Sequence, residues 1–358
     1  MLPRARADVS AAALAANLRL LSAHAGAPVL LPVKANAYGH GLTLVARATE
    51  HLPSVWGYGV ATPQEAAELR AAGVTKPVLL LTPAAPEELA ELVALGVQLT
   101  ISNGEEAARL PSGARAHLKV NTGMNRLGAR PDQAVELARQ LQARGQLVAV
   151  FTHFASSEGP DLTSADRQLA AFEAVLSALP GVTAHASNSG AVFNYGPRAA
   201  FDLVRPGIAS YGYAPEPHLR GRLPLTPALT LLARVNLLQT VPAGESVSYG
   251  ALWTAQRETR VAVLGLGYAD GYPRPATGRA RVCLGGEWRP VLGRICMDQC
   301  LVDVTGLDVA VGDWAEVLGP GEVNADTVAG WAGTISYEVL TGLGGRVERS
   351  LRAEPVAG

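Results

Sequence analysis

The first half of the chain alternates short apolar runs with amphipathic stretches of helical spacing. The runs are rich in Val and Leu and almost continuous, which is typical of parallel strands buried on both faces. They cover residues 28–34, 55–60, 77–82, 96–101, 115–120, 147–153, 182–187 and 201–205. The stretches expected to form helices are 10–25, 63–72, 86–95, 132–144 and 163–179. Eight strand–helix units in about 210 residues predict an α/β fold, a (β/α)8 barrel of the TIM type. A doubly wound open sheet is the alternative, but no GxGxxG turn follows the first strand.

The second half has a different pattern. Six prolines between residues 197 and 227 mark a boundary. Beyond it, Val/Leu-rich runs separated by Gly, Asp and Pro predict a mainly antiparallel β domain. These runs are 229–241, 259–266, 281–284, 300–304 and 314–318, with a helix expected near 324–332. We therefore expect a barrel domain over 1–225 and a β domain over 226–358, with residues 1–9 as a candidate strand of the second domain.

Composition narrows the classes of partner. The 358 residues carry a formal net charge of -1 and are only 17% charged, which argues against binding nucleic acid through bulk charge. No apolar run approaches the roughly 20 residues of a membrane helix. The three cysteines form neither a disulfide framework nor a CxxC pair, so we expect no metal site. A cytoplasmic protein with a small-molecule partner is the resulting prediction.

Lysine is unusually scarce. Lys34, Lys76 and Lys119 are the three lysines among 30 basic residues, which leaves 27 arginines. Lys34 and Lys119 each follow a strand-like run, where charge is costly. Because a guanidinium stays protonated, arginine cannot replace lysine as a nucleophilic amine. Both lysines are therefore candidates for covalent chemistry.

A barrel also predicts where reactive side chains lie. Active-site residues of such barrels follow the carboxyl ends of the strands. At these places the sequence has Lys34, Lys119, His153, Asn188-Ser189 and Arg205-Pro206-Gly207. Phosphate sites often follow strands seven and eight, where Ser189 offers a hydroxyl and Gly207 allows close approach of the backbone to an anion.

Several motifs, in order along the chain, resemble those of the alanine racemase family. The segment VKANAYGHG at 33–41 resembles the family's cofactor-lysine motif. The others are HLKVNTGMNRLG at 117–128, THFA at 152–155, SNS at 187–189, VRPGI at 204–208, GYADGY at 267–272, RICMDQ at 294–299 and TISYE at 334–338. Any one motif is weak evidence, whereas the ordered set spans nearly the whole chain and is specific.

The resemblance implies a pyridoxal 5'-phosphate enzyme that interconverts L- and D-alanine and supplies D-alanine for peptidoglycan. It also implies a homodimer in which each site combines one protomer's barrel with the partner's β domain. Lys34 would hold the cofactor and act as the base on the D-alanine face. Tyr268 matches the opposing base for L-alanine, activated through a hydrogen-bonded chain of His153 and Arg205. Arg205 would also face the pyridine nitrogen and leave it unprotonated, which limits transamination.

The remaining site residues are also assigned by the resemblance. Positions around the phosphate are Tyr38, Ser189, Gly207, Ile208 and Tyr337, with Asn188 beside them. Arg126 would approach the cofactor's phenolic oxygen and the substrate carboxylate, and Met297 would contact substrate from the partner subunit. Lys119 matches a lysine that is often carbamylated and that positions Arg126. Asn121 departs from the aspartate usual after this lysine.

Three other interpretations stay open. A barrel-type pyridoxal-phosphate amino-acid decarboxylase shares the cofactor lysine, but usually has a catalytic cysteine and a Gly-rich phosphate loop. A non-catalytic pyridoxal-phosphate carrier has a single barrel and no second domain. A racemase of broader or serine specificity is poorly distinguished by sequence.

Overall fold

The computed structural model describes residues 2–352, which divide into two compact units. The barrel unit comprises Leu14–Ala37 and Leu42–Leu225. The β unit comprises the chain up to Ala13, the short segment Tyr38–Gly41 and the chain from Thr226 onward.

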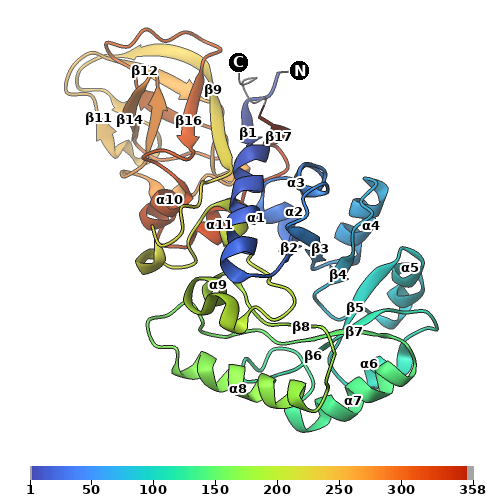
Figure 1. The fold of residues 1–358 in the computed structure, drawn as a ribbon. Coiled ribbons are helices and arrows are strands. Elements are labelled where there is room, and N and C mark those ends of the chain that lie inside the picture. The colour runs from blue at the N-terminus through green and yellow to red at the C-terminus, as the bar shows by residue number, and fades with distance from the viewer. Residues whose placement is uncertain (1, 353–358) are drawn as a thin grey trace, which may run out of the picture. The chain divides into compact units, whose positions relative to one another are not determined.

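The barrel unit is built on a parallel sheet in which each strand pairs with the next one along the chain (Figure 1). Its strands are β2 (Val29–Pro32), β3 (Val55–Val60), β4 (Val78–Leu80), β5 (Val97–Ile101), β6 (Ala116–Lys119), β7 (Leu147–Phe151) and β8 (Ala184–His185). Isolated parallel bridges from Val29 to Val204 and from His185 to Leu203 close the sheet into a barrel. The predicted (β/α)8 fold is confirmed, although its eighth strand is reduced to these bridges. Pro206, two residues after Val204, has no N–H to continue the ladder.

Helices follow the strands of the barrel. The helices up to residue 195 are α1 (Ala11–Ala25), α2 (Lys34–Tyr38), α3 (Leu42–Thr49), α4 (Pro63–Ala71), α5 (Leu89–Ala94), α6 (Gly104–Arg109), α7 (Pro131–Ala143), α8 (Thr163–Ser177) and α9 (Ser189–Tyr195). α4 shows why they begin where they do. The Thr62 hydroxyl accepts the Glu65 amide, the Glu65 carboxylate accepts the Thr62 amide, and Pro63 starts the helix.

The β unit is a mostly antiparallel barrel. Its strands are β1 (Ala5–Val9), β9 (Leu229–Val241), β12 (Thr259–Leu264), β13 (Arg281–Leu284), β14 (Glu287–Leu292), β15 (Cys300–Asp303), β16 (Trp314–Leu318) and β17 (Glu348–Leu351). They pair in the order β12-β15-β14-β13-β16-β9-β1-β17, and a further β12–β9 pairing closes six of them. The long strand β9 can serve three neighbours because its 13 residues offer each of them a stretch to pair with. The predicted antiparallel β domain is confirmed.

Two smaller features of the β unit bear on function. A hairpin of β10 (Ser246–Val247) and β11 (Trp253–Thr254) carries an exposed tip, and its base packs on a small apolar cluster that includes Val261 and Leu292. Helices α10 (Ala325–Ala332) and α11 (Ser336–Thr341) follow the last long strand. The sequence predicted α10 but not α11.

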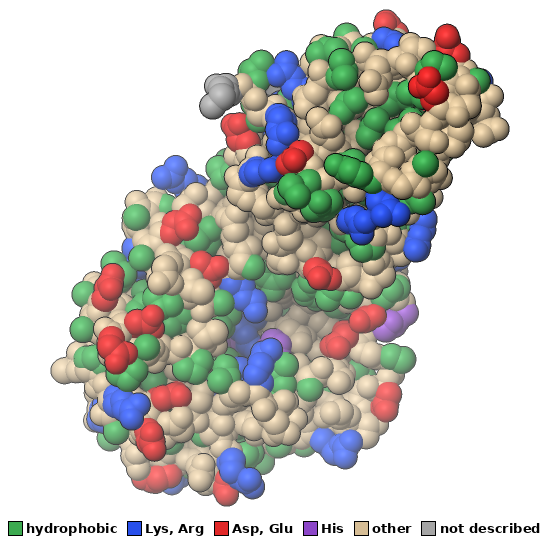
Figure 2. Space-filling model, turned by 180° about the vertical axis from the view of Figure 1, so that it is seen from behind, with side chains coloured by type: hydrophobic (Ala, Val, Ile, Leu, Met, Phe, Trp, Pro, Cys, Tyr) green, Lys and Arg blue, Asp and Glu red, His purple; other side chains and the backbone are tan. Residues whose placement is uncertain are grey.

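The surface agrees with the weak charge pattern of the sequence. In Figure 2, acidic and basic side chains are interspersed over the visible face, without a broad field of one sign. None of the helices formed by residues 2–352 has the length and apolar character needed to cross a bilayer. The same residues contain no cluster of three or more His, Cys, Asp or Glu side chains that could hold a metal.

Candidate functional site

Lys34 lies at the carboxyl end of β2 and opens an unusual turn. The four residues that follow it, 35–38, all have φ of 53°, so this stretch is a left-handed helical turn made without glycine. Left-handed backbone costs L-residues roughly 1–2 kcal/mol each. Such strain persists only where the surroundings hold it, and it concentrates at functional sites. The strained turn therefore makes Lys34 a candidate functional residue.

Burial and neighbouring positive charges lower the pKa values of the two strand-end lysines of the barrel unit. Burial, followed by the charge of Arg126, lowers the pKa of Lys34. Burial lowers the pKa of Lys119 to about 7, with the charges of Arg205, Arg126 and Lys34 adding to the effect. Burial lowers the pKa of Arg205 to about 9, so its guanidinium remains charged at neutral pH. A region with this balance of charge favours anions and raises the share of the neutral, nucleophilic amine at its lysines.

Arg205 anchors a buried chain of histidines. Its Nη1 lies 2.6 Å from His185 Nδ1, His185 Nε2 lies 2.9 Å from His117 Nδ1, and His117 Nε2 lies 2.7 Å from Gln98 Oε1. Since Arg205 can only donate, each histidine accepts at Nδ1 and donates at Nε2. Burial lowers the pKa of His117 to about 3 and that of His185 well below its usual range. This neutral chain fixes the guanidinium without a carboxylate partner.

His153 contacts the other side of the same guanidinium. Arg205 Nη2 lies 3.2 Å from His153 Nδ1 and also donates to the carbonyls of Thr152 and Ala186. Burial, then the charge of Arg205, lowers the pKa of His153 well below its usual range. The ring is therefore neutral, accepts at Nδ1 and has an Nε2–H left to donate. A group of this kind stabilises a nearby oxyanion.

The candidate phosphate residues follow β8 and the closing bridges. Ser189 begins α9 and is 4% exposed, and its Oγ accepts the amide of Ala209 at 3.3 Å. Gly207 and Ile208 lie in the adjacent turn, at the start of a short 3-10 helix. The Asn188 side chain already has hydrogen-bond partners within the protein, because its Oδ1 accepts the Ala191 amide and the Ser157 hydroxyl. Asn188 thus caps α9, which leaves the hydroxyl of Ser189 and the backbone amides as the anion donors.

Arg126 lies on an exposed loop after β6. Asn121 Oδ1 accepts the amides of Gly123 and Asn125, and its Nδ2 donates to Asn125 Oδ1 at 3.0 Å. An aspartate has no N–H to donate to Asn125. The Asn121 side chain therefore stabilises this loop through a hydrogen bond that the family's usual aspartate could not make. Asn125, immediately before Arg126, has φ of 56°.

Tyr268, Met297 and Tyr337 belong to the β unit. Gly267 brings the Tyr268 loop directly onto the Met297 loop, since a Cβ at Gly267 would lie 2.3 Å from the Met297 carbonyl oxygen. Tyr268 is 41% exposed and Met297 52% exposed. Tyr268 also lines a hollow of about 400 Å³ beside α11, the helix that carries Tyr337. The Tyr337 ring lies 6.2 Å from that of Tyr38, whose pKa is raised to about 12 by burial.

An ion-pair clamp holds these two loops. Asp270 is 1% exposed, and its Oδ2 accepts the Gly267 amide at 2.9 Å. Arg346 donates from Nε to Asp270 and from Nη2 to Asp298, both at 2.8 Å. The clamp fixes Tyr268 and Met297 relative to each other within the β unit.

Tyr249, at the tip of the β10–β11 hairpin, was not predicted from the sequence. Tyr249 is 71% exposed, and its neighbours Ser248 and Ala251 have φ of 67° and 48° without being glycine. The Ser248 hydroxyl donates to the Arg294 carbonyl at 2.7 Å, which fixes the tip to the RICMDQ segment. A large, exposed aromatic on a strained and anchored turn is a functional candidate. The sequence feature that could have indicated it is a tyrosine between Ser248 and Gly250 in a short hairpin.

A barrel whose strand ends carry lysine amines of lowered pKa beside buried and neighbouring arginines is typical of an enzyme that handles anionic ligands by amine chemistry. Family comparisons specify it further. The alanine racemase N-terminal domain model matches residues 9–215, and the C-terminal domain model matches residues 228–351. The alanine racemase of Deinococcus radiodurans is 60% identical over 349 residues, covering 98% of this chain and 99% of that one.

Solved structures agree. The alanine racemase of Streptomyces lavendulae is 39% identical with a TM-score of 0.88, covering 99% of this chain and 98% of that one. That of Clostridium difficile is 31% identical with a TM-score of 0.91, covering 98% and 96%. The chain belongs to the alanine racemase family, as the motifs predicted. It is therefore an amino-acid racemase, an isomerase.

Proposed function

We propose that this chain interconverts L- and D-alanine with pyridoxal 5'-phosphate, using Lys34 and a tyrosine of the β unit as the two bases. The observation that carries the proposal is Lys34 itself, one of three lysines, at a barrel strand end with a lowered pKa. A lowered pKa favours the neutral amine, which can bond to an aldehyde and later exchange a proton.

The donor set fits this cofactor. Its phosphate is an anion, and Ser189 with the amides near Gly207 and Ile208 supplies hydrogen-bond donors. Arg126 and Arg205 supply fixed positive charge. When bound, the cofactor draws electrons from the substrate Cα. Arg205 can donate to a ring nitrogen but cannot protonate it, which limits proton return at the wrong carbon.

The proton chemistry requires bases on both faces of Cα. The Lys34 amine would take or return the proton on one face. On the other face a phenol must be activated, because a free tyrosine has a pKa of about 10. The neutral His153, oriented by Arg205, offers an Nε2–H that would stabilise a phenolate oxygen.

Two tyrosines of the β unit compete for this role. Tyr268 was predicted from its motif. Tyr249 is more exposed and stands on a strained turn, and both features favour it as the opposing base. Tyr268 would then border the substrate, near Met297.

Lys119 is proposed to carry a carbamate. Its pKa of about 7 leaves the amine neutral often enough to react with carbon dioxide. The product is an anion among Arg126, Arg205 and Lys34, where the unmodified lysine would be a further cation. It would orient Arg126 toward the substrate carboxylate.

A homodimer with shared sites would complete the arrangement. Large apolar side chains on the β unit are exposed, among them Tyr249, Leu252, Met297 and Ile335 at 71%, 56%, 52% and 60%. A partner protomer that covered these side chains would remove their apolar surface from water. In the cell we propose a cytoplasmic enzyme that supplies D-alanine for peptidoglycan.

The test is chiral analysis of L-alanine and L-serine, incubated separately with purified protein and cofactor in deuterated water. D-alanine carrying deuterium at Cα, with little D-serine, is the expected result. D-serine at an equal rate would broaden the specificity. Loss of carbon dioxide from the substrate would indicate a decarboxylase, and bound cofactor without exchange would indicate a carrier.

A further inference from the structure

The left-handed turn after Lys34 is exposed where it begins, so packing does not hold it there. Ala35 and Asn36 are both exposed to solvent. Ala37 donates its amide to the Val33 carbonyl at 2.7 Å, and Asn36 Oδ1 accepts the Leu42 amide at 2.7 Å. These contacts secure the end of the turn. The amide directly after Lys34, that of Ala35, takes part in neither of these contacts.

Glu65 supplies the acceptor for this amide. Its Oε1 accepts the Ala35 amide at 2.7 Å, and its Oε2 accepts the Ala61 amide at 2.8 Å. The two amides belong to the loops that follow the neighbouring parallel strands β2 and β3. One carboxylate thus joins the loop that starts at Lys34 to the loop that starts α4.

The simplest explanation is that Glu65 only caps α4, and the molecule contains a comparison for it. Glu106 holds the corresponding position at α6. Its Oε2 accepts the Ser102 amide and its Oε1 accepts the Asn103 side chain, so both oxygens stay within its own loop. Glu65 instead directs one oxygen to a residue 30 positions earlier, next to the cofactor lysine. Capping does not require that contact.

We propose that Glu65 is a positioning residue for Lys34, holding the first amide of the left-handed turn and placing a negative charge beside the lysine amine. The inference rests on the proposed function, because Lys34 matters as the reacting amine. Glu65 raises the pKa of Lys34 and so opposes burial and Arg126, which lower it. It would keep enough of the amine protonated to return a proton while the turn keeps Nζ in place.

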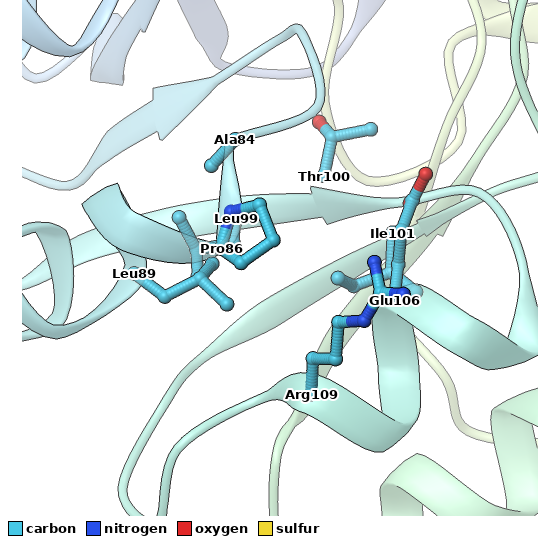
Figure 3. Close-up of a pocket in the computed structure, with 8 residues that line it drawn as sticks. All are labelled: Ala84, Pro86, Leu89, Leu99, Thr100, Ile101, Glu106 and Arg109. Carbon is cyan, nitrogen blue, oxygen red and sulfur yellow. The ribbon is translucent and has the colours of Figure 1, made fainter.

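The test compares Glu65→Gln with Glu106→Gln in the full-length chain. Glu106 is a matched control because it caps a barrel helix and lines only a small cavity of about 30 Å³, room for about one water (Figure 3). Each protein, freed of cofactor, is labelled with an amine-reactive reagent across a pH series. The extent of labelling is measured peptide by peptide. Since the chain has three lysines, Lys76 serves as an internal reference.

Removing the negative charge disfavours the protonated amine. We expect Glu65→Gln to move the labelling midpoint of Lys34 to lower pH by on the order of half a unit or more. Glu106→Gln should leave that midpoint unchanged. Equal midpoints in the two variants would overturn the proposal. A wild-type chain without racemase activity would overturn the proposed function alone, because labelling reports on Glu65 and Lys34 directly.

Glu65→Asp separates charge from reach and covers the case of a Glu65→Gln protein that fails to fold. The shorter side chain keeps its charge but cannot span both loops. We expect a Lys34 midpoint close to wild type, with kcat lower by about tenfold and KM little changed, as for a misplaced reacting group. Full kcat in Glu65→Asp would rule out a positioning role.

Discussion

The candidate residues of the barrel unit and those of the β unit differ in burial and in how many contacts they make within their own unit. In the barrel unit, Arg205 is buried and bonded to His153 and His185, and Lys34 begins a turn held from several sides. In the β unit, Tyr249 and Tyr268 lie on loops held by hydrogen bonds but remain substantially exposed. The candidate residues of the barrel unit are thus already fixed to one another, whereas under the proposed function those of the β unit would need another surface to complete a site. That contrast underlies the proposal of a shared site.

The largest effect is expected from removing the amine of the barrel unit. Lys34→Arg keeps a positive charge but cannot bond covalently to the cofactor, so racemisation should fall by at least about 10³-fold. Cofactor retained after dialysis and the rate of D-alanine formation measure it. Lys76→Arg is the control, since Lys76 donates to backbone carbonyls of Leu52 and Val55 away from the strand-end lysines. An active Lys34→Arg enzyme would remove the lysine from the chemistry.

Tyrosine variants test which residue of the β unit acts as the opposing base. The phenylalanine variant of the opposing base should lose about 10²–10⁴-fold in rate while retaining cofactor, since it lacks only the exchangeable proton. We expect this of Tyr249→Phe, and a smaller loss in Tyr268→Phe. The rates of Cα deuterium exchange from L- and D-alanine measure it in both variants. The reverse ranking would restore Tyr268 as the base, and two active variants would contradict a tyrosine base altogether.

Loosening the clamp should have a moderate effect. Arg346→Gln removes the charge that joins Asp270 to Asp298 and should lower kcat/KM by several-fold, because it frees the Tyr268 and Met297 loops without removing a reacting group. Steady-state kinetics in both directions measure it. Arg281→Gln breaks an exposed pair with Glu322 elsewhere in the β unit and serves as the control. Equal effects of the two variants would show that the clamp has no role in the site.

The last prediction concerns folding stability rather than activity, and it depends on Lys119. Its pKa falls from 10.5 to about 7 on folding. Between these values the unfolded chain binds the extra proton, so this group penalises folding progressively as pH falls from 10.5 to 7, and fully below 7. In carbonate-free buffer, Lys119→Met should therefore be more stable than wild type by on the order of 1–3 kcal/mol at neutral pH, converging toward pH 10.5. Urea unfolding across pH measures the difference.

Bicarbonate then tests the carbamate. A carbamate converts the unfavourable cation into an anion beside Arg126 and Arg205, so added bicarbonate should stabilise wild type and leave Lys119→Met unchanged. A wild-type chain that is indifferent to bicarbonate would contradict the modification.

The sequence predicted the features that follow from chain periodicity. The strand-end rule found Lys34, Lys119 and Arg205 because parallel strands bring their carboxyl ends to one rim of the barrel. It did not identify His117 and His185, because they lie within strands, where the sequence pattern predicts buried core side chains. It could not foresee the left-handed turn, since residues 35–38 contain no glycine.

The other omissions have separate causes. Glu65 was visible only as a helix-capping residue, and its contact with Ala35 depends on how two loops meet in space. The sequence did not predict strand β14, because Pro290 interrupts its apolar pattern. Proline is usually rare within strands, although this strand tolerates it. Tyr249 lies in a hairpin too short to give a periodic signal.

The central claim, that one protomer's barrel completes its site with the other protomer's β unit, is tested most directly by hybrid dimers. Lys34→Ala is mixed with whichever tyrosine variant proves inactive, and the two are unfolded and refolded together. A shared site predicts that the hybrid contains one intact site, so activity should return to about a quarter of wild type for random pairing in a two-fold dimer. If each protomer builds its site alone, every site keeps one defect. An inactive mixture that contains hybrid dimers would contradict the account.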